Sequence, residues 1–184
     1  MKTDARVRYT RMVIKNSFLE LLQEKPVSRI TVTEICRRSH INRTTFYKHY
    51  MDPLDLMEKL EEELLQSVRS LITQKSYRDI TTVFCDVLSA LKENSGQYRA
   101  LVSAYGDNRL LRRIFVLCRD TVFTLICSKY PHLDSTQQNL LYCYITQGFS
   151  GTVSYWIENG MEEPVEKLAE FAGRATMAVT RGFA

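Results

Sequence analysis

Apolar residues recur at helical spacing along almost the whole chain, and this feature constrains the fold most. Ile14, Phe18, Leu21 and Leu22 form one such stripe, and similar stripes follow throughout the 184 residues. Glycine and proline are rare, with 7 and 4 copies, so turns are few. No segment shows the alternation of a half-buried strand. The sequence therefore predicts an all-α fold of about nine helices.

Capping residues and turn residues separate these stripes into helices. Thr31 and Glu34 have the spacing of a capping box, Asn42 suits an N-cap, and Asp52-Pro53 places an N-cap before a proline at the first helical position. We expect the later helices over about 80–91, 98–105, 109–130, 135–156 (capped by Ser135) and 164–179.

Basic charge is concentrated at the start of the chain. Residues 1–52 contain 11 Lys/Arg and 5 Asp/Glu, whereas the remaining residues contain 14 and 16. A basic end on a near-neutral body suits an anionic partner, either nucleic acid or a membrane surface. An ordinary solvated surface explains the charge equally well.

The cysteines indicate a reducing compartment. They are Cys36, Cys85, Cys118, Cys127 and Cys143. None forms a CxxC pair or has a histidine at ligand spacing, so neither a disulfide framework nor a metal site is expected. No secretory signal or membrane span is expected either, and the predicted location is the cytoplasm.

The segment between the second and fourth predicted helices has a pattern that suits DNA binding. A tight turn at His40-Ile41-Asn42 leads into a short helix from Arg43 to about His49. Ile41, Phe46 and Tyr50 are predicted to pack inward. The neighbours expected to face outward are Arg43, Thr44, Thr45, Tyr47 and Lys48.

A helix of this kind fits the major groove, where its first residues meet the base edges. Arg43 can pair with guanine, and Thr44 and Thr45 can bond to bases or touch a thymine methyl group. Tyr47, Lys48 and the amides near Thr33 suit phosphates. The side chains expected along the DNA backbone or in a minor groove are those of Arg6, Arg8 and Arg11.

Residues 30–56, ITVTEICRRSHINRTTFYKHYMDPLDL, resemble the signature of the TetR/AcrR family of transcriptional regulators. The run from Thr45 to Tyr50 matches that pattern position by position. By resemblance, the DNA-facing set is Thr33, Arg43, Thr44, Thr45, Tyr47 and Lys48, with His49 in a structural or phosphate-side position. Two residues depart from the family: His40 replaces a usual glycine, and Pro53 replaces a frequent lysine.

The resemblance implies a bacterial homodimer that binds double-stranded, palindromic operator DNA. It implies a helix-turn-helix DNA-binding domain over 1–52. It also implies a helical effector-binding and dimerisation domain over 53–184, linked by the fourth helix, whose last two long helices pair with their copies. The expected function is a repressor released by a small-molecule effector. The alternative is a regulator controlled by a protein partner, with no small-molecule pocket.

Two further sets of residues are candidates in the second domain. The predicted dimer interface is Gly148, Gly151, Thr152, Tyr155 and Trp156. These residues can equally serve packing within one subunit. The predicted effector contacts are Arg119, Phe115, Phe123 and Tyr105, because Arg119 falls on an apolar helix face where a charge needs a partner. Asp86 or Asp120 can supply that partner instead, or the side chain can extend to solvent.

No catalytic set is recognisable in the sequence. Gly148 to Thr152 lacks the final glycine of a GxSxG nucleophile elbow and falls in a helical pattern. No metal-ligand spacing and no glycine-rich phosphate loop are present. We therefore expect neither an enzyme nor a cofactor.

Overall fold

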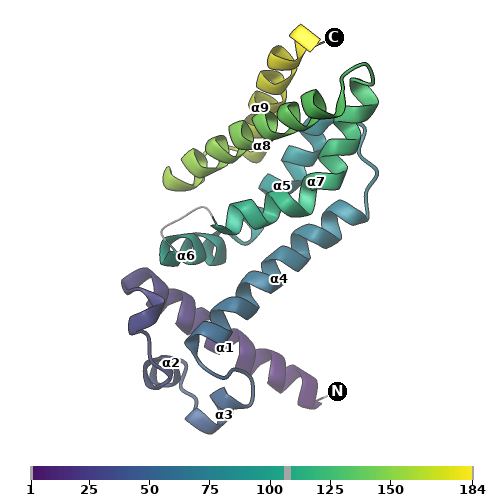
Figure 1. The fold of residues 1–184 in the computed structure, drawn as a ribbon. Coiled ribbons are helices and arrows are strands. Elements are labelled where there is room, and N and C mark those ends of the chain that lie inside the picture. Colours follow the sequence, from purple (N-terminus) through teal and green to yellow (C-terminus); the bar gives the residue numbers. More distant parts are fainter. Residues whose placement is uncertain (1, 106–108, 184) are drawn as a thin grey trace. The chain divides into compact units, whose positions relative to one another are not determined.

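The computed structural model describes the backbone of residues 2–105 and 109–183, and the side chains of residues 5–101 and 109–183. Within these ranges the chain forms nine α-helices and two short 3₁₀ helices, and no strand (Figure 1). The predicted all-α fold is confirmed. None of the described helices is both long enough and apolar enough to cross a membrane.

The helices follow the predicted order closely. Their bounds are α1 Lys2–Glu24, α2 Val32–Arg38, α3 Arg43–Tyr47, α4 Pro53–Thr73, α5 Ile80–Glu93, α6 Ser95–Tyr105, α7 Arg109–Lys129, α8 Ser135–Glu158 and α9 Val165–Thr180. The 3₁₀ helices are Val27–Arg29 and Arg181–Phe183. The third helix is shorter than predicted, because it ends at Tyr47 rather than His49.

Side-chain caps fix several helix starts. The carboxylate of Asp52 accepts a hydrogen bond from the Asp55 amide at 2.9 Å, as its place before Pro53 predicts. The predicted cap of α8 was one residue late. Asp134, not Ser135, is the N-cap, and it forms a capping box with Gln137.

The chain divides into two compact units. The head unit comprises Met1–Leu64 and Gly96–Leu110, and the body unit comprises Leu65–Ser95 and Leu111–Ala184. Helix α4 contributes to both, and α6 belongs to the head unit. These bounds describe packing, and the functional division into 1–52 and 53–184 stays a prediction.

The head unit has its own apolar core. Ile14 and Phe18 of α1, Ile35 of α2, Phe46 of α3 and Leu60 of α4 are all fully buried. Helix α6 is tied to α4 by a 2.7 Å hydrogen bond from the Gln97 amide group to the Leu60 carbonyl. The short helices α2 and α3 therefore share a buried core with the longer helices α1 and α4. This packing compensates for the low intrinsic stability of short helices.

The body unit packs around α5. The ring of Phe84 on α5 stacks on Phe149 of α8 with centroids 3.8 Å apart, and Phe115 of α7 meets Phe149 edge-on. Helix α9 runs close against α5 because Gly173 presents no side chain toward Thr81. A Cβ atom at Gly173 would overlap the Thr81 hydroxyl and lie 3.0 Å from Thr81 Cβ.

We predict that Gly173→Ala destabilises the body unit by about 1–3 kcal/mol, because α5 and α9 must separate to admit the methyl group. Trp156, the only tryptophan, is buried in this unit, so its fluorescence during urea unfolding measures the effect. Gly96→Ala is the control, since nothing lies within 4 Å of the added Cβ on α6. Equal unfolding midpoints for wild type and Gly173→Ala would contradict the close α5–α9 contact.

Candidate nucleic-acid interface

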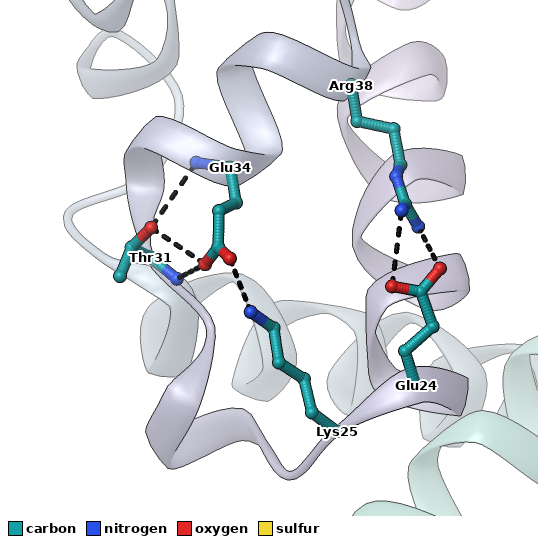
Figure 2. A network of polar contacts seen from close by, with 5 residues as sticks. All are labelled: Glu24, Lys25, Thr31, Glu34 and Arg38. Atoms are coloured by element: carbon teal, nitrogen blue, oxygen red, sulfur yellow. Dashed lines mark hydrogen bonds and ion pairs between the residues drawn. The ribbon is translucent and has the colours of Figure 1, made fainter.

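Helix α2 begins with the predicted capping box. The Thr31 hydroxyl accepts a hydrogen bond from the Glu34 amide at 3.3 Å, and the Glu34 carboxylate accepts one from the Thr31 amide at 3.0 Å. Figure 2 shows this reciprocal pair at the first turn of α2. The box fixes the helix start, and Thr33 is exposed just inside it.

Two ion pairs attach α2 to the end of α1. Lys25 Nζ lies 2.5 Å from Glu34 Oε1, and the Arg38 guanidinium donates two hydrogen bonds to Glu24, at 2.7 and 3.2 Å (Figure 2). The hydrogen bonds from Lys25 and Thr31 lower the pKa of Glu34 from 4.5 to about 2. The hydrogen bond from Arg38 lowers the pKa of Glu24 as well.

The turn after α2 places His40 in the left-handed region, with φ at 55°. The amide of Ile41 donates to the Cys36 carbonyl at 3.1 Å, which is the long bond of a Schellman motif. The position where the family usually has glycine therefore needs a positive φ here too. Histidine carries some backbone strain at such a position.

Helix α3 has one buried side and one exposed side. The Asn42 side chain caps it by accepting from the Thr45 amide at 2.7 Å, as predicted. Phe46 is fully buried and Tyr50, just after the helix, is 4% exposed. Ile41 is half-buried.

The predicted DNA-facing residues lie on the open side. The exposed ones are Thr33, Arg43, Thr44, Tyr47 and Lys48. Thr45 is half-buried. Arg43 Nη2 donates to Thr33 Oγ1 at 2.5 Å, so the first residues of α2 and α3 share one surface. On α1, Arg6, Arg8 and Arg11 are also exposed.

His49 is half-buried, and burial is the first cause of its lowered pKa. The positive charges of Arg11 and Lys48 lower it further. The imidazole is therefore neutral at pH 7, which suits a structural role better than an ion pair with phosphate.

Lys59 is a positioning residue that sequence reasoning missed. Its ammonium group donates to the His49 carbonyl at 3.1 Å and to Asp55 at 2.9 Å, and so fastens the end of the α3 segment to α4. The i,i+4 spacing of Asp55 and Lys59 is visible in the sequence. The contact with His49 is not, because it depends on the angle at which α4 leaves the turn.

The candidate effector residues are not brought together into one hollow. Arg119 is exposed rather than inward-facing, and its guanidinium lies 5.9 Å from the ring centroids of Phe123 and Tyr142. Of the alternatives left open for Arg119, the exposed side chain fits extension to solvent across these rings. Phe115 is buried against Phe149. The side chain of Tyr105 lies outside the described residues.

The candidate dimer residues divide into two groups. Gly148, Gly151 and Tyr155 are exposed on α8, and Thr152 is half-buried. Trp156 is only 2% exposed, and its indole N–H donates to the Glu163 carbonyl at 3.0 Å. The assignment of Trp156 to an interface was therefore wrong, since it fills the core of its own body unit.

A hollow of about 670 Å³ runs between α8 and α9 within the body unit. Gly148 and Thr152 line it beside Cys143 and Tyr144 from α8 and Val179 from α9. Neither Arg119, Phe115 nor Phe123 lines it.

Helices α2 and α3 form a helix-turn-helix, a DNA-binding motif found in many regulators. It consists of the capped helix α2, the Schellman turn and helix α3 with its exposed Arg, Thr, Tyr and Lys side chains. Residues 78–177 match the TetR family model described as "Transcriptional regulator C-terminal region". Because this match covers more than half of the chain, the protein belongs to the TetR family of transcriptional regulators.

Individual relatives agree with this assignment. The uncharacterized HTH-type transcriptional regulator YxbF of Bacillus subtilis (strain 168) is 29% identical over 178 residues, covering 90% of this chain and 44% of YxbF. The chain thus spans less than half the length of that relative. A TetR transcriptional regulator from Streptococcus agalactiae 2603V has a similar solved structure, with a TM-score of 0.66 and 22% identity over 96% of this chain and 98% of that one. The dihydroxyacetone kinase operon activator DhaS matches with a TM-score of 0.65 and 19% identity, over 95% and 97% of the two chains.

The lowered pKa of Glu34 predicts an acid-sensitive helix α2. The folded state holds the Glu34 carboxylate ionised, so its stabilisation is complete above pH 4.5 and is lost as the pH falls toward 2. We expect amide protection factors in α2 to fall over this window in the wild type. Glu34→Gln should lower protection at pH 7 and weaken its pH dependence. Glu58→Gln, an exposed change on α4, is the control, and parallel profiles for Glu34→Gln and wild type would contradict the assignment.

Proposed function

We propose that this protein is a homodimeric, sequence-specific DNA-binding regulator that represses transcription from a palindromic operator and is released by a small-molecule effector. The observation that carries the proposal is the exposed surface shared by Thr33 and Arg43, held in place by the buried Phe46 beneath it. A helix exposed on one side and anchored on the other is what major-groove insertion requires.

The proposed DNA contacts fall into two kinds. Arg43, at the first position of α3, pairs with guanine, and Thr44 and Thr45 contact neighbouring bases. Tyr47, Lys48 and the first amides of α2 near Thr33 hold phosphates and fix the register. Binding to guanine requires Arg43 to exchange its hydrogen bond with Thr33 for one with the base. His49 supports this surface from behind as a neutral side chain.

The proposed dimer uses α8 and α9. These helices expose large apolar side chains that an isolated subunit leaves in water: Leu140, Tyr144, Tyr155, Phe171, Met177 and Val179. Exposed apolar surface of this extent is typical of an interaction site. A second copy is the occupant that a palindromic operator requires, because a two-fold dimer places one α3 in each half-site.

Repression, release by an effector and a cytoplasmic location complete the proposal. The effector acts by binding more tightly to a conformation whose two α3 helices no longer match the half-site spacing. The fold does not decide the sign of regulation, since DhaS, which has a similar fold, is an operon activator by name. A regulator controlled by a protein partner is the second candidate, and neither candidate requires catalysis or a cofactor.

Replacing Arg43 with alanine should weaken operator binding by about 1–3 kcal/mol and relax specificity at one base pair. Affinity is measured by fluorescence anisotropy on the DNA upstream of the protein's own gene and on a scrambled duplex, over a range of salt concentrations. Lys167→Ala, which removes one exposed charge from the body unit, is the matched control. Equal losses on both duplexes would assign Arg43 to a phosphate instead.

A charge on the α8 face should separate the subunits. Tyr144 is 62% exposed and lines the hollow between α8 and α9, so Tyr144→Asp should yield monomers by sedimentation equilibrium. The same variant should lose cooperative occupation of the two half-sites. Val116→Asp is the control, because Val116 is 69% exposed on α7 and outside this face. A Tyr144→Asp protein that remains dimeric would exclude this face.

A further inference from the structure

A second hollow, of about 370 Å³, lies within the body unit among α5, α7, α8 and α9. We infer that it is the effector site and that it takes a small molecule with an apolar body and a single anionic group. The volume is at the lower end of the range of ligand pockets. The regulatory role of the site rests on the proposed function, whereas binding to it does not.

The wall of the hollow is mostly apolar. The apolar lining residues are Ile80, Leu125, Ile126, Tyr130, Ile145 and Met177. The hydroxyl-bearing residues of the lining are Thr81, Ser128, Thr176 and Thr180. This combination suits a ligand whose hydrocarbon part is buried while a few polar groups fix its orientation.

The charged lining residues favour an anion. Arg78 and Lys129 are exposed at the hollow, and neither forms an ion pair within the described part of the chain. Asp79 is the opposing charge, and its carboxylate oxygens accept from the Thr82 amide at 2.9 Å and the Thr82 hydroxyl at 2.8 Å. The Thr82 amide is the first cause of the lowered pKa of Asp79, and the positive charge of Lys129 lowers it further. With two cations against one carboxylate, the charged lining is net positive, which favours a ligand with a carboxylate or similar group.

The hollow lies next to the proposed dimer face and next to the segment that follows α4, the helix shared with the head unit. Ile145 and Thr176 line this hollow and also the one between α8 and α9, so a ligand here contacts the proposed dimer face from inside. Arg78 and Asp79, which line another wall, come directly after the segment 74–77 that follows α4. The segment is held on α5 because Lys75 and Tyr77 both bond to Asp86 at 2.8 Å.

Tight packing makes these walls move together. Gly173 of α9 lies against Thr81 of α5, and Thr81 itself lines the hollow. A ligand that spreads α5 from α9 must therefore shift the helix that carries the dimer face or the segment that joins α4. Packed interfaces of this kind switch between discrete arrangements rather than deforming gradually.

Direct binding tests the site without DNA. Octanoate, octan-1-ol and octylammonium share one apolar chain and differ in charge, so each is titrated into the full-length protein by calorimetry. We expect octanoate to bind the most tightly. The Arg78→Gln/Lys129→Gln variant should weaken octanoate binding by about tenfold or more and leave octan-1-ol unchanged. Leu125→Trp, which fills the hollow, should abolish binding of both.

An Arg174→Gln/Lys167→Gln variant removes the same amount of charge from α9, at residues that do not line the hollow, and should bind octanoate like the wild type. No octanoate binding, equal affinity for octanoate and octan-1-ol, or octanoate affinity unaffected by the Arg78/Lys129 changes would each overturn the site. Both variants that remove cations alter exposed side chains, so loss of folding is not expected to intervene.

A second arm tests the effector role on operator DNA. Saturating octanoate should change the operator affinity of the wild type and not that of Arg78→Gln/Lys129→Gln. Octanoate binding that leaves operator affinity unchanged would overturn the effector role. A ligand-free protein that does not bind the operator would count against the proposed function and not against the hollow.

Discussion

The burial of Phe46 is the interaction on which the DNA-binding surface depends. Helix α3 has five residues, too few to be stable alone, and Phe46 is its one fully buried side chain. The Asn42 cap and the Schellman turn at His40 set its start, and the bond from Lys59 to the His49 carbonyl holds the segment after it. Every outward residue from Arg43 to Lys48 takes its direction from this anchor, so the specificity of the proposed contacts rests on apolar packing underneath them.

Helix α4 is shared by the two units, and in the proposed mechanism it links effector binding to DNA binding. It starts beside the α3 segment at Pro53, where Lys59 bonds to His49, and ends at Thr73 in the body unit. The connection that follows is fastened by Asp86 and leads directly into the wall of the 370 Å³ hollow. In the proposed mechanism, an effector bound there changes DNA binding if its affinity differs between two conformations of this connection.

Local sequence patterns predicted the fold and the face of α3, because caps and helical periodicity act over a few residues. The Thr31 capping box and the Asn42 cap appear where expected, and the positive φ at His40 occurs where the family usually has glycine. Predictions that needed the direction of a side chain in the packed body unit were less successful. Trp156 folds back onto the Glu163 carbonyl, and Arg119 reaches solvent across Phe123 and Tyr142. The hollow at Arg78 and Lys129 was not visible in the sequence, since its walls come from four helices that only tertiary packing assembles.

The most direct test of the central claim is dimethyl sulfate protection on DNA from upstream of the protein's own gene. This reagent methylates guanine N7 in the major groove and adenine N3 in the minor groove. The account predicts protected guanine N7 atoms in two clusters, about one helical turn or a multiple of it apart, and their loss in Arg43→Ala. Protection confined to adenine N3, or guanine protection unchanged in Arg43→Ala, would contradict insertion of α3 into the major groove.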